Sequence, residues 1–265
     1  MVFRDFLIDP SVLGAGWTGA MQPLGFVALD ALPPGLAMAD LPPFPLIGLG
    51  DPAHPAAACL DAVVEPPFTA DMLARSITAN PRAAAVAVQL LRAIEGLPVE
   101  VALFQESLAY GLLQGSVEHA AWLATQASVR AEREGRVAAE RDGDVLSIRL
   151  DRAEASNAID RNMRDRLHEL FTLAALDPDL STVRLSGAGK AFCIGADLGE
   201  FGTTRDPATA HLIRMQTLPA HGIHRAAAKL EVHIQGGCVG AGLEMAAFAA
   251  RMTASVNAWF QLPEL

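Results

Sequence analysis

The sequence predicts an α/β protein made of two domains, the first mostly helical with a few short strands and the second built from alternating strands and helices. Thirteen of the 17 prolines precede residue 100 and separate short apolar runs there. From residue 137 onward, segments with strand and helix patterns follow one another. Residues 130–136 between these regions are largely charged, as is typical of a solvated helix end or a linker. We therefore place the two domains at residues 1–133 and 134–265.

In the first domain, short apolar runs predict buried strands and longer apolar stretches predict helices. The runs cover residues 24–29, 46–49 and 60–64. The tripeptide Thr69-Ala70-Asp71 resembles a helix start. Proline opens each of the next two helices, which we expect at residues 83–94 after Pro81 and at residues 99–132 after Pro98.

In the second domain, the predicted elements begin with a β-hairpin over residues 137–150, whose turn is marked by Asp142-Gly143. Helices are expected at residues 161–176, 208–230 and 243–252, and strands at residues 182–185 and 232–235. A glycine-containing loop at residues 186–190 follows the first of these strands. This alternation is what predicts an α/β domain rather than a helical bundle.

Composition describes an acidic, folded protein. The net charge of −10 and the pI near 5.1 argue against nucleic acid as a partner, because phosphate binding needs clustered Lys and Arg. Three cysteines, Cys59, Cys193 and Cys238, form no even framework, which predicts a reducing compartment. The N-terminus has no signal-peptide core, and no apolar run reaches the roughly 18 residues of a membrane helix. We therefore expect a cytoplasmic protein that does not bind membranes.

Motifs for nucleotide and metal binding are incomplete in this sequence. Gly187-Ala188-Gly189-Lys190 looks like the end of a phosphate-binding loop, but Arg184 stands where the first glycine is required. Gly240-Ala241-Gly242 opens a dinucleotide fingerprint, but Met245 takes the place of the third glycine. His221 and His224 have a spacing compatible with a metal, yet no Cys or carboxylate cluster accompanies them. We expect no metal and no redox cofactor.

Two glutamates, Glu244 and Glu264, each follow a short motif near the end of the sequence. Glu244 lies in the glycine-rich residues 236–246, which predict a turn running into a helix. Glu264 lies in Phe260-Gln261-Leu262-Pro263-Glu264. Two carboxylates that share one water can act as a general base and a general acid. Either glutamate alone would be an ordinary helix-start or surface residue.

Four motifs taken in order resemble the crotonase (enoyl-CoA hydratase/isomerase) superfamily. They are residues 151–158, 187–198, 236–246 and 260–265, and the resemblance covers residues 137–265. It implies a crotonase-like ββα spiral core in this part of the chain. It also implies chemistry that passes through the enolate of a CoA thioester, with no prosthetic group and with coenzyme A present as part of the substrate.

The resemblance implies an oxyanion hole made by the backbone N–H groups of Ala196 and Ala241. Donors of this kind stabilise the developing enolate charge by about 3 kcal/mol each. Many relatives have glycine at the second position, and alanine still supplies the N–H. The resemblance assigns Glu244 to the water that adds to Cβ and Glu264 to proton transfer at Cα, although the two can share both roles.

The same resemblance implies that backbone segments hold the adenine and pantetheine arm of coenzyme A. The residues concerned are Asn157, Ala158, Ile194, Ala196, Asp197, Leu198 and Ala241. The resemblance further implies a homo-oligomer, a dimer or a trimer.

The sequence departs from the family pattern at both ends of the matching region. Relatives continue past the Pro-Glu dipeptide into a loop and further helices, whereas Leu265 is the last residue here. Residues 79–85 and 106–111 are similar to the closing helices of crotonases, and residues 44–64 to a degraded strand-loop-strand segment. We therefore expect the first domain to be a degraded, permuted crotonase C-terminal half that covers the second domain. An unrelated helical cap is the alternative.

The function that these residues predict first is that of an enoyl-CoA hydratase, with syn addition of water to a 2-enoyl-CoA. Other reactions through the same enolate are the alternatives, namely double-bond isomerisation, CoA-thioester hydrolysis and cofactor-independent dioxygenation. A non-catalytic crotonase-like scaffold is the alternative outside enzymes.

Overall fold

The computed structural model describes residues 3–13, 17–32, 35–126 and 134–263. The chain folds into two compact units, Met1–Ala121 and Trp122–Leu265. This division precedes the predicted domain boundary, which falls among residues 127–133 outside the described part. Both units combine helices with sheets, so the predicted α/β class is confirmed.

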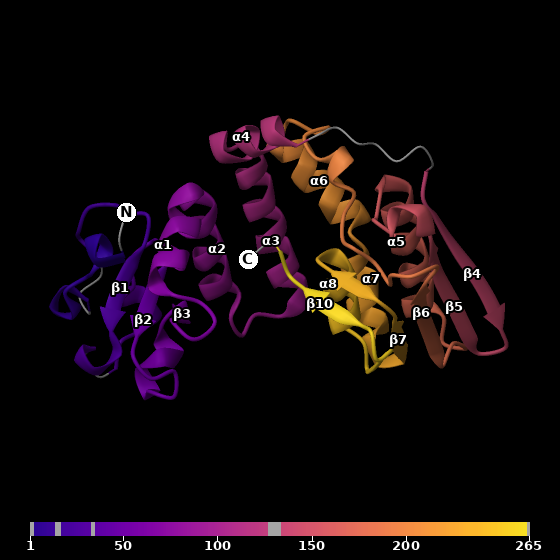
Figure 1. Ribbon diagram of the computed structural model, residues 1–265. Helices are drawn as coiled ribbons and strands as arrows, with labels where there is room; N and C mark the ends of the chain where they lie inside the picture. The colour runs from indigo at the N-terminus through magenta and orange to yellow at the C-terminus, as the bar shows by residue number, and fades with distance from the viewer. Residues whose placement is uncertain (1–2, 14–16, 33–34, 127–133, 264–265) are drawn as a thin grey trace. The chain divides into compact units, whose positions relative to one another are not determined.

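Three short parallel strands form the sheet of the first unit (Figure 1). Strand β1 (Gly25–Ala28) pairs with β2 (Leu46–Leu49), and β2 pairs with β3 (Ala62–Val63). The three apolar runs predicted as strands are therefore confirmed. Parallel strands covered on both faces read as continuous apolar runs, and Phe26, Val27 and Leu46 are fully buried.

Four helices follow this sheet along the chain. They are α1 (Ala70–Ala79), α2 (Pro81–Ile94), α3 (Val99–Gln114) and α4 (Val117–Thr125). The helix starts expected near Thr69 and Pro81 are confirmed, since the Thr69 hydroxyl accepts a hydrogen bond from the Met72 N–H at 3.2 Å. The single long helix expected from residue 99 is wrong. Helix α3 ends at Gln114, before Gly115. The Ser116 hydroxyl then caps α4 by accepting a hydrogen bond from the His119 N–H at 3.1 Å.

A partly buried ion pair holds α2 against the sheet of the first unit. The Arg92 guanidinium lies 2.5 Å from the Asp61 carboxylate, and it also donates to the backbone oxygens of Pro42 and Phe44. Asp61 in turn accepts from the Leu46 N–H at 2.7 Å. Because every charge here has a partner, the pair can remain buried.

The second unit contains a five-stranded sheet with the order β4-β5-β6-β7-β9 (Figure 1). Its strands are β4 (Arg136–Asp142), β5 (Val145–Asp151), β6 (Thr182–Gly187), β7 (Leu230–Ile234) and β9 (Arg251–Ala254). Strands β4 and β5 form the predicted antiparallel hairpin, and the remaining neighbours are parallel.

One face of this sheet forms the core of the second unit together with the helices. On β5, Leu146, Ile148 and Leu150 point into the core, whereas the residues between them are exposed. The helices are α5 (Arg161–Leu176), α6 (Pro207–Thr217) and α7 (Pro219–Ala226). Helix α5 has the predicted bounds, and the helical stretch expected at residues 208–230 is interrupted at Pro219, because proline removes a backbone donor.

A second, two-stranded parallel sheet pairs β8 (Gly237–Val239) with β10 (Trp259–Gln261). Helix α8 (Ala241–Ala247) connects β8 to β9. The helix expected at residues 243–252 is therefore wrong at both ends. It begins at Ala241, and residues 251–254 are extended because they pair with β7.

The remaining short elements are 3-10 helices. They cover Phe3–Phe6, Pro10–Val12, Leu29–Ala31, Met38–Asp40, Pro55–Cys59, Ala153–Ala155, Leu198–Glu200 and Ala227–Lys229. Within the described ranges, no helix is both long enough and apolar enough to cross a bilayer.

Candidate functional site

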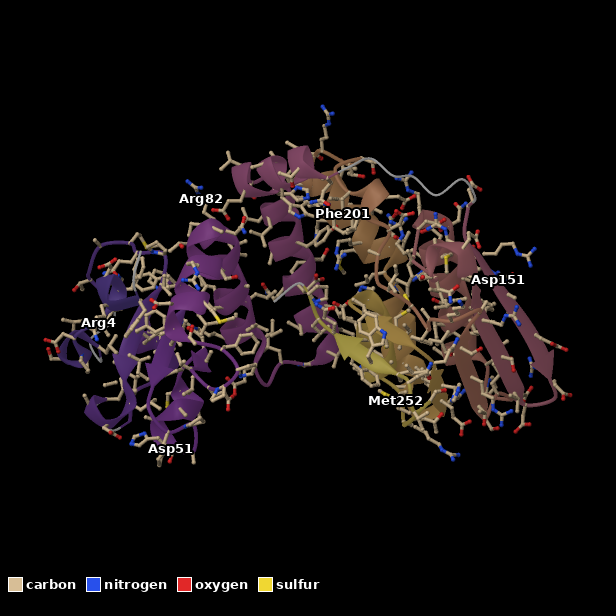
Figure 2. All side chains as sticks on the ribbon, in the orientation of Figure 1. Arg4, Asp51, Arg82, Asp151, Phe201 and Met252 are labelled. Carbon is tan, nitrogen blue, oxygen red and sulfur yellow. The ribbon has the colours of Figure 1, made fainter. Side chains whose placement is uncertain are left out.

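The first part of the candidate site is the loop between β5 and α5. It begins after Asp151, the β5 residue labelled in Figure 2. Ser156 and Asn157 both have positive φ, at 51° and 58°, a conformation that asparagine tolerates better than most residues. The buried Asn157 side chain donates to the backbone oxygens of Ala188 and Ala191 at 2.8 and 2.9 Å. Asn157 thus ties this loop to the segment that leads into residues 193–198.

The second part is the segment containing Ala196. The residues on either side of Ala196, Gly195 and Asp197, each form a backbone hydrogen bond with Ile159. The Ile159 N–H donates to the Gly195 oxygen at 2.8 Å, and the Asp197 N–H donates to the Ile159 oxygen at 2.9 Å. Ala196 therefore lies opposite Ile159 in an isolated parallel bridge. Within the described residues, the Ala196 N–H itself donates no hydrogen bond.

The third part is the turn between β8 and α8, and it repeats the pattern of the second. Cys193-Ile194-Gly195-Ala196 and Cys238-Val239-Gly240-Ala241 share the order Cys, β-branched, Gly, Ala. The two cysteines pair in parallel, so each alanine lies three residues beyond the same register position. Gly195 and Gly240 both have positive φ, at 97° and 48°. The two segments thus turn at the same register position, and each turn ends at the backbone N–H of an alanine.

The two turns approach each other closely. A Cβ atom built on Gly195 would lie 3.8 Å from the Ala241 nitrogen and 3.4 Å from the Val239 oxygen. Like Ala196, Ala241 donates its N–H to no acceptor in the described part of the chain. Two adjacent N–H groups without protein acceptors are the backbone requirement for stabilising an oxyanion.

Glu244 lies on α8, three residues after Ala241, so both lie on the same side of the helix. It is exposed, whereas the neighbouring Met245 and Ala246 are buried in the core. Helix α8 therefore presents Glu244 outward from the core while its other face anchors it.

Glu264 lies outside the described residues, but the segment leading to it is well placed. Gln261 of β10 pairs with Val239 of β8, and the Gly240 N–H donates to the Gln261 oxygen at 3.0 Å. The chain preceding Glu264 therefore runs beside the turn that carries Ala241. The roles assigned to Glu244 and Glu264 remain predictions.

The residues predicted to hold coenzyme A differ in accessibility. Asn157 and Ala158 are buried, whereas Ala153 and Glu154 of the same loop are exposed. Ile194 and Leu198 are 41% and 54% exposed. Asp197 is mostly buried, and its carboxylate accepts hydrogen bonds from Arg152 at 2.8 Å and from the Gly199 N–H at 2.9 Å. The Asp197 side chain is thus part of the scaffold of the site.

Sequence reasoning missed two charged residues in this scaffold, Arg152 and Asp160. Both are buried, and the Arg152 guanidinium lies 3.6 Å from the Asp160 carboxylate. A signal was available for Asp160, because an aspartate directly before a predicted helix is a typical N-cap, and its carboxylate accepts from the Met163 N–H at 2.9 Å. Arg152 carries no comparable local signal.

Burial also determines the reactivity of Cys193 and Cys238, whose backbones pair but whose thiols are free. It raises the pKa of the Cys193 thiol to about 12 and that of Cys238 to about 11. Thiolates are the reactive form, so both thiols are inert near neutral pH. No group of three or more metal-binding side chains occurs within the ranges that the structure describes.

These pKa values predict which cysteine reacts in the folded protein. At pH 8, iodoacetamide is expected to alkylate the exposed Cys59 and to leave Cys193 and Cys238 intact, because both buried thiols remain protonated. Peptide mass mapping measures the modified sites, and the urea-unfolded chain is the control in which all three react. Alkylation of Cys193 as fast as Cys59 in the folded protein would contradict this.

Comparison with known proteins finds similarity in the part of the chain that contains these turns. Residues 140–265 match the family Enoyl-CoA hydratase/isomerase. Mevalonyl-coenzyme A hydratase SIDH of Beauveria bassiana is 36% identical over 135 residues, which cover 46% of each chain. (E)-Benzylidenesuccinyl-CoA hydratase of Thauera aromatica is 33% identical over 132 residues, covering 49% of this chain and 50% of the relative.

Solved structures of the same kind are also similar. A putative enoyl-CoA hydratase/isomerase from Mycobacterium abscessus is 35% identical, with a TM-score of 0.43 and coverage of 47% of this chain and 50% of that one. The second unit is an α/β domain by its own order of strands and helices. The family match at residues 140–265 confirms the resemblance inferred from the sequence for this part of the chain. The chain spans about half the length of the curated relatives it matches.

Proposed function

We propose that this protein is an enoyl-CoA hydratase, which adds water in the syn sense across the double bond of a 2-enoyl-CoA. The observation that carries the proposal is the pair of alanine amides at the ends of two register-matched turns, with Glu244 one helical turn beyond the second. The family match at residues 140–265 and relatives named as hydratases support it.

In the proposed reaction, the thioester oxygen accepts hydrogen bonds from the N–H groups of Ala196 and Ala241. Addition of water at Cβ moves the electron pair of the double bond toward the carbonyl and leaves an enolate. Each preorganised donor lowers the energy of that state by about 3 kcal/mol. The donors act most strongly on the transition state, because the negative charge on the oxygen is greatest there.

The two glutamates divide the proton transfers. Glu244 removes a proton from the water as its oxygen bonds to Cβ, and Glu264 delivers a proton to Cα as the enolate collapses. The overall reaction then consumes one water and forms a 3-hydroxyacyl-CoA. Glu264 takes its place in this scheme because the segment before it runs beside the Gly240 turn.

The acyl-CoA arm is proposed to lie along the loops that hold Ala196. Ile194 and Leu198 offer exposed apolar surface on either side of the donor, and the loop of Asn157 and Ala158 lies one bridge away. No prosthetic group is needed, since coenzyme A enters as part of the substrate. We further propose a cytoplasmic enzyme that works as a homo-oligomer, a dimer or a trimer.

The test is incubation of the full chain with crotonoyl-CoA. The expected result is loss of the enoyl absorbance, with formation of a product heavier by one water in mass spectrometry. Release of free coenzyme A thiol would point instead to thioester hydrolysis, and conversion of a 3-enoyl-CoA alone would point to isomerisation. Tight binding of CoA esters without turnover would contradict the hydratase and favour a scaffold.

A further inference from the structure

Arg152 is a buried arginine whose contacts converge on the segment that carries the first oxyanion donor. Its side chain is only 3% exposed, although a charge is costly to remove from water unless it is well paired. One terminal nitrogen, Nη1, donates to Asp197 Oδ2 at 2.8 Å and to the Ala158 oxygen at 2.9 Å. The same nitrogen lies 3.6 Å from Asp160 Oδ2.

These acceptors lie on both sides of the bridge that holds Ala196. Ala158 directly precedes Ile159, and Asp197 directly follows Ala196. Ile159 binds Gly195 and Asp197 through its own N–H and oxygen. The Arg152 guanidinium therefore closes a ring of contacts. The ring runs from Arg152 through Ala158 and Ile159 of the β5–α5 loop, across the hydrogen bonds of Ile159 to the Ala196 segment, and back to Arg152 through Asp197.

The direction of the Ala196 N–H follows from this ring. The peptide between Gly195 and Ala196 is planar and trans, so its C=O and N–H point in opposite directions. The Gly195 oxygen is held by the Ile159 N–H at 2.8 Å. The Ala196 N–H is thereby aimed away from the β5–α5 loop, and it can turn only if the ring opens.

Asp160 anchors the ring to the core of the second unit. Its two oxygens accept from the Gly135 N–H at 2.6 Å and from the Met163 N–H at 2.9 Å. The second contact caps α5, whose helix dipole also favours a carboxylate there. Because α5 packs on the sheet, the position of Arg152 is fixed by the core.

We propose that Arg152 is a positioning residue, which holds the Ala196 amide in the direction that stabilises the enolate oxygen. This inference rests on the proposed function for its catalytic consequence, but the ring itself can be measured without turnover. Lysine cannot reproduce the arrangement fully, because it keeps the positive charge but lacks the rigid guanidinium plane that sets the position of Nη1. Arg152→Lys should therefore retain part of the effect and Arg152→Met none of it.

The kinetic test compares Arg152→Met and Arg152→Lys with Arg149→Met, in which an exposed arginine of the preceding strand β5 is replaced. Removing an oxyanion donor outright costs roughly 100-fold to 1,000-fold in kcat, so misaligning one should cost about 10-fold to 100-fold. KM for crotonoyl-CoA should change much less, because the donor acts mainly on the transition state. Arg149→Met should behave as wild type. An unchanged kcat in a folded Arg152→Met variant would overturn the proposal.

The structural test is amide hydrogen exchange measured by NMR. The Asp197 N–H, bonded to the Ile159 oxygen, should be protected in the wild type and in Arg149→Met, and should lose protection in Arg152→Met. If Arg152→Met does not fold, Asp197→Asn and Arg152→Lys replace it, and retained wild-type protection in both would refute the ring. A wild type without hydratase turnover would end the proposed function, yet the exchange result would still decide whether Arg152 positions this segment.

Discussion

Replacing Glu244 by glutamine is expected to lower kcat for hydration of crotonoyl-CoA by about 100-fold to 10,000-fold, the usual contribution of a general acid–base group. Glutamine has nearly the same shape but cannot accept the proton of the attacking water. The residue is exposed on α8, so the fold should be retained. Stopped-flow or steady-state loss of the enoyl absorbance measures the change.

The matched control is Glu140→Gln, which removes an exposed carboxylate from β4 of the same unit. It should leave kcat and KM unchanged, because a surface charge far along the hairpin does not take part in proton transfer. Glu264→Gln is expected to act in the same direction as Glu244→Gln. Turnover within about threefold of wild type in the Glu244→Gln variant would refute the assignment of the general base, given the magnitudes typical of such groups.

The second large effect is on stability, and it concerns Gly236 in the turn between β7 and β8. Gly236 has φ +57°, and a Cβ atom there would lie 2.0 Å from the Lys190 backbone oxygen. Gly143 in the β4–β5 turn has nearly the same φ, +58°, but no atom lies within 4 Å of its Cβ position. The two glycines therefore have nearly the same φ, but they differ in the free space around the position of a Cβ atom.

Gly143→Ala should lower the free energy of unfolding by about 1–2 kcal/mol, the cost of a left-handed conformation. Gly236→Ala carries this cost and an overpacking cost of about 1–3 kcal/mol or more, because backbone atoms must move. Urea unfolding followed by circular dichroism measures both. Equal destabilisation of the two variants would mean that the loop at Lys190 shifts freely, contrary to its tight packing against Gly236.

The Gly236 turn also matters for the proposed site. The Phe192 N–H donates to the Gln235 oxygen at 2.7 Å, and the Trp259 N–H donates to the Gly236 oxygen at 3.0 Å. The turn thus joins the segment that leads to Ala196 with the strand that leads toward Glu264. A displaced Lys190 loop would therefore be expected to disturb catalysis as well as stability.

The first unit contains the segment predicted to be a degraded strand-loop-strand copy. Its strands β2 and β3 are parallel neighbours joined by a short 3-10 helix, and β7 and β9 of the second unit are parallel neighbours joined through β8 and α8. That residues 44–64 are a degraded copy of the strand-loop-strand segment remains a prediction. That the first domain is a permuted crotonase half covering the second remains a prediction.

Local signals determined most of the secondary structure. Helix α5 begins after the N-cap Asp160 and matches its predicted bounds, and β2 coincides with its apolar run. Where a local pattern met a competing contact, the prediction was wrong. The helix predicted at residues 243–252 included Arg251 and Met252, yet these residues belong to β9 because the edge of β7 offers backbone hydrogen bonds. The interruption at Gly115 and Ser116 was readable from the sequence, since both residue types favour helix ends.

For the candidate site, the sequence by itself indicated the resemblance to the family that residues 140–265 match, and it named Ala196, Ala241 and Glu244, because these residues lie in short contiguous motifs. Only the tertiary structure decided how the motifs combine. The parallel pairing of Cys193 with Cys238 places the two alanine amides at the same level, and Arg152 meets Asp197 across 45 residues of chain. Such contacts carry no local signal, because they depend on which strands become neighbours when the sheet assembles.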